Sequence, residues 1–184
     1  MRKINLLVSL FTLAIFKLSA QTVLNEGFES GISSPLISVV SAGTFQSGPG
    51  VIPNSNFGSA QAFTFGKSTC SSNCFNNYMT TLIITFPSPT FVAEISWKEM
   101  EIGGNWGSQG QLLLDDIPYA LNTLGALPIN SGTPDASPRL QSFSINQTLS
   151  SIKLTVVDIT SASEIVLDDL QIKYTSIPKI VGYE

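Results

Sequence analysis

Short apolar runs separated by turn-forming residues recur along the chain from residue 21 onward. Clusters of Gly, Pro, Ser and Asn lie between the runs, for example at residues 47–50, 87–89, 103–105 and 130–132. No window keeps the 3.6-residue period of an amphipathic helix. The pattern predicts strands at residues 22–28, 36–40, 62–65, 81–86, 91–97, 111–114, 119–121, 141–145, 152–159 and 164–174.

These predicted strands are not interleaved with helices, as a parallel α/β sheet would require. Their rhythm is typical of an antiparallel all-β sandwich or barrel. Apolar residues make up 43% of the 184 residues and charged residues 12%. This balance favours one packed domain over a disordered chain.

Alternation in the last two predicted strands separates a core face from a polar face. Ile152, Leu154 and Val156 share one side of their strand. In residues 164–174 the same parity places Asp168 in register with the apolar side chains of Val166 and Leu170. A carboxylate in that register must accept hydrogen bonds, bind a cation or be protonated.

A second conflict between alternation and polarity occurs around Trp97. Phe91, Ala93, Ile95 and Trp97 form an odd-numbered apolar face, which strict alternation extends through Glu99 and Glu101. Either a bulge near Lys98 reverses the parity, or the strand enters a concave polar groove. The sequence leaves both alternatives open.

The first 20 residues have the organisation of a secretory signal. Two basic residues precede an apolar run at residues 4–16, and small residues follow at positions 19 and 20. The run is shorter than the ~20 residues of a membrane span. We therefore expect a signal peptide at residues 1–20 cleaved near Ala20, a β-sandwich domain at residues 21–176, a C-terminal tail at residues 177–184, and secretion without an integral membrane segment.

Charge and residue usage exclude several classes of function. Nine basic and 13 acidic residues give a net charge of −4, which disfavours nucleic acid as a partner. The sequence has no histidine, so Ser-His and Cys-His nucleophile pairs and histidine-bound zinc are excluded. Cys70 and Cys74 are predicted to form a disulfide outside the cytosol, with a metal site as the lesser alternative.

Two terminal segments carry a resemblance to a known group of modules. The first predicted strand and its turn read VLNEGFESG, and the last strand reads EIVLDDLQIKY. Together with FVAEISWKEMEIGGNWGSQGQLLLDDIPY at residues 91–119, they resemble extracellular jelly-roll modules of the carbohydrate-binding-module, MAM and concanavalin-like type. The resemblance implies an antiparallel β-sandwich of jelly-roll type.

The same resemblance implies a structural calcium ion shared by the first turn and the last strand. The matching side chains are Glu29 and Asp168, with Glu26 and backbone carbonyls as further ligands. The alternative is that Asp168 accepts hydrogen bonds from the backbone of a neighbouring loop. Asp115 and Asp116 repeat the Leu-Asp-Asp pattern, but Ile-Pro-Tyr follows at once, which favours a hairpin turn.

The leading hypothesis is a secreted, noncatalytic β-sandwich that binds a glycan or another extracellular surface ligand. Trp106, in a Gly-rich loop, is the main candidate for stacking on a sugar ring. The other candidate ligand-binding residues are Glu99, Glu101, Trp97, Tyr78 and Tyr119; Trp97 is alternatively a core residue.

Two further hypotheses come from other classes of protein. One is a structural or adhesive surface module that binds protein or matrix. The other is a glycoside hydrolase that uses Glu99 and Glu101, although the stretch lacks the E-x-D-x-x-E pattern of the best-known jelly-roll hydrolases.

Overall fold

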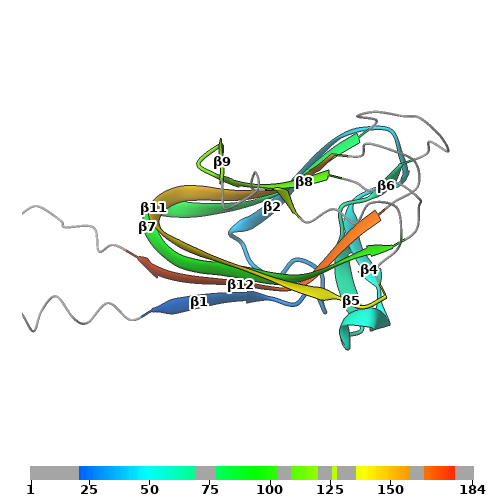
Figure 1. Ribbon diagram of the computed structural model, residues 1–184, viewed down its shortest axis with the longest axis horizontal. Helices are drawn as coiled ribbons and strands as arrows, with labels where there is room; N and C mark the ends of the chain where they lie inside the picture. The colour runs from blue at the N-terminus through cyan, green and yellow to red at the C-terminus, as the bar shows by residue number, and fades with distance from the viewer. Residues whose placement is uncertain are drawn as a thin grey trace, which may run out of the picture.

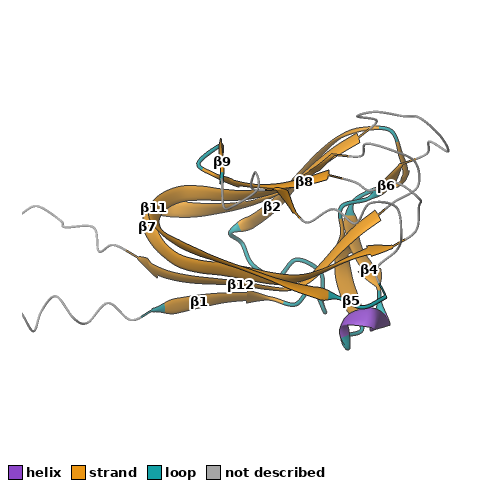
Figure 2. Ribbon diagram, in the orientation of Figure 1, coloured by secondary structure: helices purple, strands orange, loops and turns teal. Residues whose placement is uncertain are grey.

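A computed structural model describes residues 21–68, 78–102, 109–119, 126–127, 136–157 and 164–176. The predicted signal peptide, the C-terminal tail, Cys70, Cys74 and Trp106 lie outside these ranges. The strands are β1 (Thr22–Glu26), β2 (Ile37–Gly43), β3 (Phe45–Ser47), β4 (Gly50–Pro53), β5 (Gln61–Thr64), β6 (Lys67–Ser68), β7 (Tyr78–Ile102), β8 (Gln109–Leu114), β9 (Ile117–Pro118), β10 (Ala126–Leu127), β11 (Arg139–Val157) and β12 (Glu164–Ser176). A 3₁₀ turn, η1 (Ser55–Phe57), lies between β4 and β5 (Figure 2).

The strands form two facing layers joined by the long strands β7 and β11, which bend from one layer into the other (Figure 1). The β2 layer contains β2, the first half of β7, the second half of β11, and β8 with β9 and β10 along its edge. The β12 layer contains the first half of β11, the second half of β7, and β12, which pairs with β1 and β5. All of these pairings are antiparallel, so the predicted all-β antiparallel sandwich of jelly-roll type is confirmed.

The strands predicted at residues 81–86 and 91–97 are therefore one element, β7. Its ladder with β11 passes from the pair Thr85–Ser151 to the pair Thr90–Leu149 and skips Pro87 and Pro89. Proline has no N–H to donate, so the prolines lie where β7 leaves one layer for the other.

The main hydrophobic core fills the space between the layers. Leu82 and Leu154 from the β2 layer and Trp97 and Ile172 from the β12 layer are completely buried there. A smaller cluster of Phe57, Ala62, Met100 and Val166 lies on the outer side of the β12 layer, beneath η1. None of the described helical residues forms a segment long and apolar enough to cross a bilayer.

The predicted odd-numbered apolar face of β7 is wrong at its start. Val92 is completely buried, whereas Phe91 is 39% exposed. Val92 pairs with Tyr174 and Glu94 pairs with the adjacent Lys173, so Ala93 is an extra residue in the ladder. This bulge reverses the alternation between Val92 and Ile95.

A second bulge corrects the predicted position of Asp168. Asp168 pairs with Lys98, but the next pair along the ladder joins Gln171 to Ser96, which leaves one extra residue in β12. Asp169, within the bulge, has a φ of 51°. The parity therefore reverses, so Leu170 points into the main core while Asp168 shares the outer side with Val166.

Candidate functional site

Trp97 belongs to the core and offers no ring face to a ligand. Its side chain is completely buried, and its ring stacks on Phe143 with centroids 5.3 Å apart. The ring of Tyr119 meets Phe143 edge to face, with ring centroids 6.4 Å apart. The Tyr119 hydroxyl donates to the Ser144 carbonyl at 2.7 Å. This hydrogen bond connects the residue after β9 to β11. Trp97 and Tyr119 therefore both pack against Phe143.

Glu99 and Glu101 also point into the sandwich, with only 2% and 4% of their surface exposed. Residues 98, 99 and 100 pair consecutively with residues 168, 167 and 166 of β12, and the bulge beside Lys98 lies in β12, so β7 itself has no extra residue there that would turn the two acids outward. The Glu99 carboxylate accepts hydrogen bonds from the Trp97 indole at 2.9 Å and the Gln141 amide at 3.0 Å. An Arg139 nitrogen lies 3.5 Å from the same carboxylate.

This network explains how a carboxylate is tolerated between the two layers. Charge-assisted hydrogen bonds and an opposite charge offset the cost of removing a carboxylate from water. A carboxylate that acts on a glycosidic bond must reach the substrate. The predicted hydroxyl-binding and catalytic roles of the pair are therefore not supported by its location.

Glu29 and Asp168 hold two consecutive residues of the segment after η1. Ser59 Oγ donates to Asp168 Oδ2 at 2.5 Å, and the Ala60 N–H donates to Glu29 Oε1 at 3.1 Å. Asp168 also accepts the Asp169 N–H at 2.8 Å and is completely buried. The first turn and the last strand therefore meet at this point, as the resemblance implied.

Burial raises the pKa of the Asp168 carboxyl, and the negative charges of Asp169 and Glu29 act in the same direction. The hydrogen bonds from Ser59 and Asp169 act in the opposite direction. A cation between the two carboxylates would relieve this repulsion, and carboxylate and hydroxyl oxygens are ligands that calcium accepts.

The donors present fit a calcium ion in kind. Calcium takes ~6–8 oxygen ligands, so backbone carbonyls or water would have to complete the shell. Within the ranges that the structure describes, no third acidic, cysteine or histidine side chain joins the two carboxylates. Calcium at Glu29 and Asp168 stays a prediction.

Glu26, the third predicted metal ligand, has a different role. Its carboxylate accepts the backbone N–H groups of Phe28 at 3.2 Å and of Ser33 and Ser34 at 2.8 Å. The Ser33 hydroxyl adds a fourth hydrogen bond at 2.8 Å. Glu26 is 2% exposed and thus organises the turn after β1, where its oxygens are already occupied.

The outer side of the β2 layer presents an extended surface of mixed polar and apolar side chains, which the sequence did not identify as a site. We call it the β2-layer face. It consists of the side chains that alternate with the core residues of four neighbouring strands: Ser38, Val40, Met79, Thr81, Ile83, Gln111, Leu113, Lys153 and Thr155.

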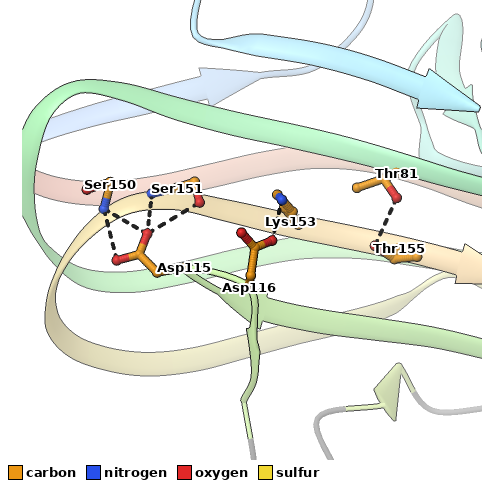
Figure 3. A network of polar contacts seen from close by, with 7 residues as sticks. All are labelled: Thr81, Asp115, Asp116, Ser150, Ser151, Lys153 and Thr155. Carbon is orange, nitrogen blue, oxygen red and sulfur yellow. Dashed lines mark hydrogen bonds and ion pairs between the residues drawn. The ribbon is translucent and has the colours of Figure 1, made fainter.

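Strand register arranges the β2-layer face in rows. Val40, Thr81, Thr155 and Gln111 are successive cross-strand partners, and the Thr81 and Thr155 hydroxyls lie 3.0 Å apart (Figure 3). Val40 is 56% exposed and Gln111 is exposed, whereas Thr155 is half-buried and Thr81 is buried. The row therefore alternates methyl groups, hydroxyls and an amide across the sheet.

The hairpin between β8 and β9 fixes one end of this face. Asp115 accepts the backbone N–H groups of Ser150 and Ser151 at 2.9 and 2.7 Å, and Lys153 forms an ion pair with Asp116 (Figure 3). Asp115 and Asp116 have φ values of 46° and 68°, so both occupy the left-handed region used in tight hairpin turns. The predicted hairpin at this repeat of Leu-Asp-Asp is confirmed.

The remaining predicted residues are not placed by the structure. Trp106, Cys70 and Cys74 lie outside the described residues, and Tyr78 is described only by its backbone, which pairs with Gly43. The signal for the β2-layer face was present in the sequence as the alternation of residues 151, 153 and 155 with the core. The assembly of the rows required the register of four strands.

Known proteins resemble this chain in fold. No family model and no curated protein matches the sequence. A cleaved adhesin domain of Lys-gingipain from Porphyromonas gingivalis aligns with a TM-score of 0.57 and 14% identity, covering 83% of this chain and 98% of that chain. The carbohydrate-binding module TmCBM61, solved with beta-1,4-galactotriose, aligns with a TM-score of 0.50 and 18% identity over 79% of this chain and 92% of the module.

A family 29 carbohydrate-binding module complexed with mannohexaose aligns with a TM-score of 0.50 and 7% identity, covering 84% of this chain and 92% of the module. At these identities the likeness concerns the fold. The chain shares its jelly-roll sandwich with carbohydrate-binding modules and adhesin domains.

Proposed function

We propose that the chain is a secreted, noncatalytic module that binds a glycan through the β2-layer face. The observation that carries the proposal is the row of Val40, Thr81, Thr155 and Gln111 on four paired strands. The exposed Gln111 amide and the half-buried Thr155 hydroxyl can donate to and accept from sugar hydroxyls, and the buried Thr81 hydroxyl bonds Thr155 from below. The methyl groups between them offer contact to the C–H faces of a sugar ring.

The charges of the β2-layer face favour an uncharged glycan. Lys153 is the only charged residue of the face as we define it, and its ammonium is paired with Asp116. The acidic net charge of the chain adds repulsion toward anionic polysaccharides. A neutral polysaccharide is therefore the class of ligand that we propose.

Shared architecture supports this class of function without identifying the ligand. Two of the structures with this fold are complexes with oligosaccharides, beta-1,4-galactotriose and mannohexaose. One fold hosts many functions, so the argument for the ligand depends on the face itself. We retain Trp106, which precedes β8 in the sequence, as the proposed stacking aromatic.

The noncatalytic part of the proposal is supported by the location of the two acids that a hydrolase would need. Glu99 and Glu101 are buried between the layers, and Glu99 is committed to Trp97 and Gln141. Release of reducing ends from a retained polysaccharide by the wild-type chain, abolished in Glu99→Gln or Glu101→Gln, would overturn this assignment.

Two glutamines on opposite layers provide a matched test of the binding face. Gln111 is exposed on the β2-layer face, and Gln171 is exposed on the outer side of β12. Gln111→Ala should weaken retention on a neutral polysaccharide about 2- to 10-fold, the value of one net hydrogen bond, whereas Gln171→Ala should leave retention unchanged. Affinity electrophoresis across a polysaccharide panel measures both.

The outcomes separate the ligand class from the location of the site. Equal retention of the wild type and both glutamine variants would remove the β2-layer face from the proposal. Absence of retention on every neutral polysaccharide would overturn glycan binding. Trp106→Ala should reduce retention without lowering the melting temperature; unchanged retention would remove Trp106 from the site.

A further inference from the structure

Strand β2 forms an edge of the β2 layer among the described strands, because it pairs only with β7. The Thr85 N–H donates to the Leu36 carbonyl at 2.9 Å, which sets the phase of the ladder. Residues 38, 40 and 42 then direct their backbone groups toward β7, and Val39 and Ser41 direct theirs away from it.

The free ladder is limited at both ends. The Ile37 N–H donates to the Ser34 carbonyl at 3.1 Å, so it is already used in a turn. Gly43, at the other end, has a φ of 110° and departs from extended backbone. Val39 and Ser41 are therefore the two residues whose backbone groups are poised for a further strand.

The sequence around this edge lacks the features that usually prevent strand association. Residues 30–66 contain no Asp, Glu, Lys or Arg, although the whole chain is acidic. β2 itself contains no proline. Charged residues and proline are the common means of blocking an edge strand. Two copies of an acidic chain can thus meet at this edge without bringing like charges together.

We propose that β2 pairs with β2 of a second copy of this chain, antiparallel and centred on Val40. In this register Val39 lies opposite the partner's Ser41, and Ser41 lies opposite the partner's Val39, so each pair exchanges two hydrogen bonds. Because Val39 and Ser41 both direct their backbone N–H and C=O groups away from β7, the edge of one copy is complementary to the same edge of another copy.

The exposure of the Val40 side chain also supports a pairing centred on Val40. Val40 is 56% exposed and would lie across the two-fold axis from the partner's Val40, at a non-hydrogen-bonded position where facing side chains are closest. A ladder this short buries less than the ~1,200 Å² of a stable interface. The pairing is weak, and its dimer forms with rising protein concentration.

The consequence for binding rests on the proposed function. Antiparallel pairing of two edge strands joins the two β2 layers into one continuous sheet, with both β2-layer faces on the same side. A long polysaccharide could then engage two faces at once, which raises its overall affinity without any new contact to sugar.

Cysteine cross-linking tests the register without any glycan. At a non-hydrogen-bonded pair the Cα atoms are about 4.5 Å apart, within the range of a disulfide. Val40→Cys should therefore give a disulfide-linked dimer under mild oxidation, above the background of the wild type with its native Cys70 and Cys74. Ser38→Cys is the matched control, because its partner in this register is the partner's Ala42, and it should not link.

Ser38→Cys combined with Ala42→Cys should restore the linked dimer. Equal linkage of Val40→Cys and Leu140→Cys, an exposed position on β11 in the other layer, would indicate random collision and overturn the proposal.

Sedimentation velocity over a concentration series gives an independent measurement. The mean mass of the wild type should rise with concentration, and Val40→Lys should abolish the rise by placing two ammonium groups across the axis. A wild type that stays monomeric at every concentration would overturn the dimer, whatever the outcome of the glycan measurements. Loss of glycan retention with the dimer intact would instead contradict the proposed function.

Discussion

Asp168 is buried by a segment distant in sequence and not by the alternation of its own strand. The bulge at Asp169 turns the Asp168 carboxylate to the outer side of β12, and the segment after η1 covers it through Ser59. The charged groups around it are Glu29, Asp169 and Lys98; Lys98 forms an ion pair with Asp169 at 2.7 Å. Without a cation, burial and the two neighbouring acids raise the pKa of the Asp168 carboxyl.

The sign of the resulting pH dependence can be stated. Because the pKa of Asp168 is raised in the folded chain, the folded state binds a proton more tightly than the unfolded state. In the presence of chelator, the contribution of Asp168 to stability should fall as pH rises from the ordinary carboxyl range through the raised pKa. Asp168→Asn should remove this decline, as chemical denaturation across pH would show.

Calcium should act in the opposite direction to burial, because it stabilises the ionised carboxylate. We expect calcium to raise the melting temperature of the wild type and of Asp169→Asn, but not of Asp168→Asn. Asp169 is the matched control, because its exposed carboxylate forms an ion pair with Lys98 and is not one of the predicted calcium ligands. Identical melting curves of the wild type with calcium and with chelator would favour the alternative in which Ser59 and backbone hydrogen bonds alone satisfy Asp168.

At the scale of elements, the β8–β9 hairpin is held to β11 by side chains in its turn. Asp115 bonds two consecutive backbone N–H groups of β11, at the point where the β7–β11 ladder shifts between Leu149 and Ser151. Asp116, the next residue, forms only an exposed ion pair with Lys153. The hairpin carries Gln111 and thereby one end of the β2-layer face.

The neighbouring aspartates allow the contribution of this contact to be measured. Asp115→Ala and Asp116→Ala both place alanine in the left-handed region, so that cost is shared. Asp115→Ala should lower the free energy of unfolding by about 1 to 2 kcal/mol more than Asp116→Ala, because it also loses the hydrogen bonds to Ser150 and Ser151. Urea denaturation measures the difference; equal losses would contradict the anchoring role.

At the scale of the whole molecule, the chain combines a predicted export signal with a sandwich fold and a close cysteine pair. A disulfide between Cys70 and Cys74 would close a short loop, which removes little entropy from the unfolded chain. The presence of this disulfide would therefore indicate an oxidising compartment, while it would add little to the stability of the fold.

Intact mass spectrometry of the exported protein checks these expectations together. The mature chain should begin at Gln21, and alkylation without reductant should label no cysteine. Cys70→Ser is the control, because it should expose a single reactive thiol at Cys74. Retention of residues 1–20 in exported material, or two alkylatable thiols in the wild type, would contradict the predictions.

Local patterns in the sequence were enough to predict most of the longer strands, their antiparallel arrangement and the hairpin at Asp115, but they missed the short strands β3, β4 and β6. These features depend on neighbours along the chain: alternation places Ile152, Leu154 and Val156 on one side of a strand whatever it pairs with. For Glu99 the sequence left a bulge near Lys98 and a polar groove as open alternatives, and it could not supply the partners Gln141 and Arg139 that the structure gives this carboxylate.

Tertiary structure decided everything that depends on register between strands. The bulges at Ala93 and Asp169 each add one residue to a ladder, and such an insertion becomes apparent only against the partner strand. The first placed Val92 instead of Phe91 in the core, and the second left Asp168 beside Val166 but on the opposite side from Leu170. The β2-layer face and the open edge at Val39 and Ser41 likewise exist only after β2, β7, β11 and β8 have paired, because side chains distant in sequence become neighbours through their backbone hydrogen bonds.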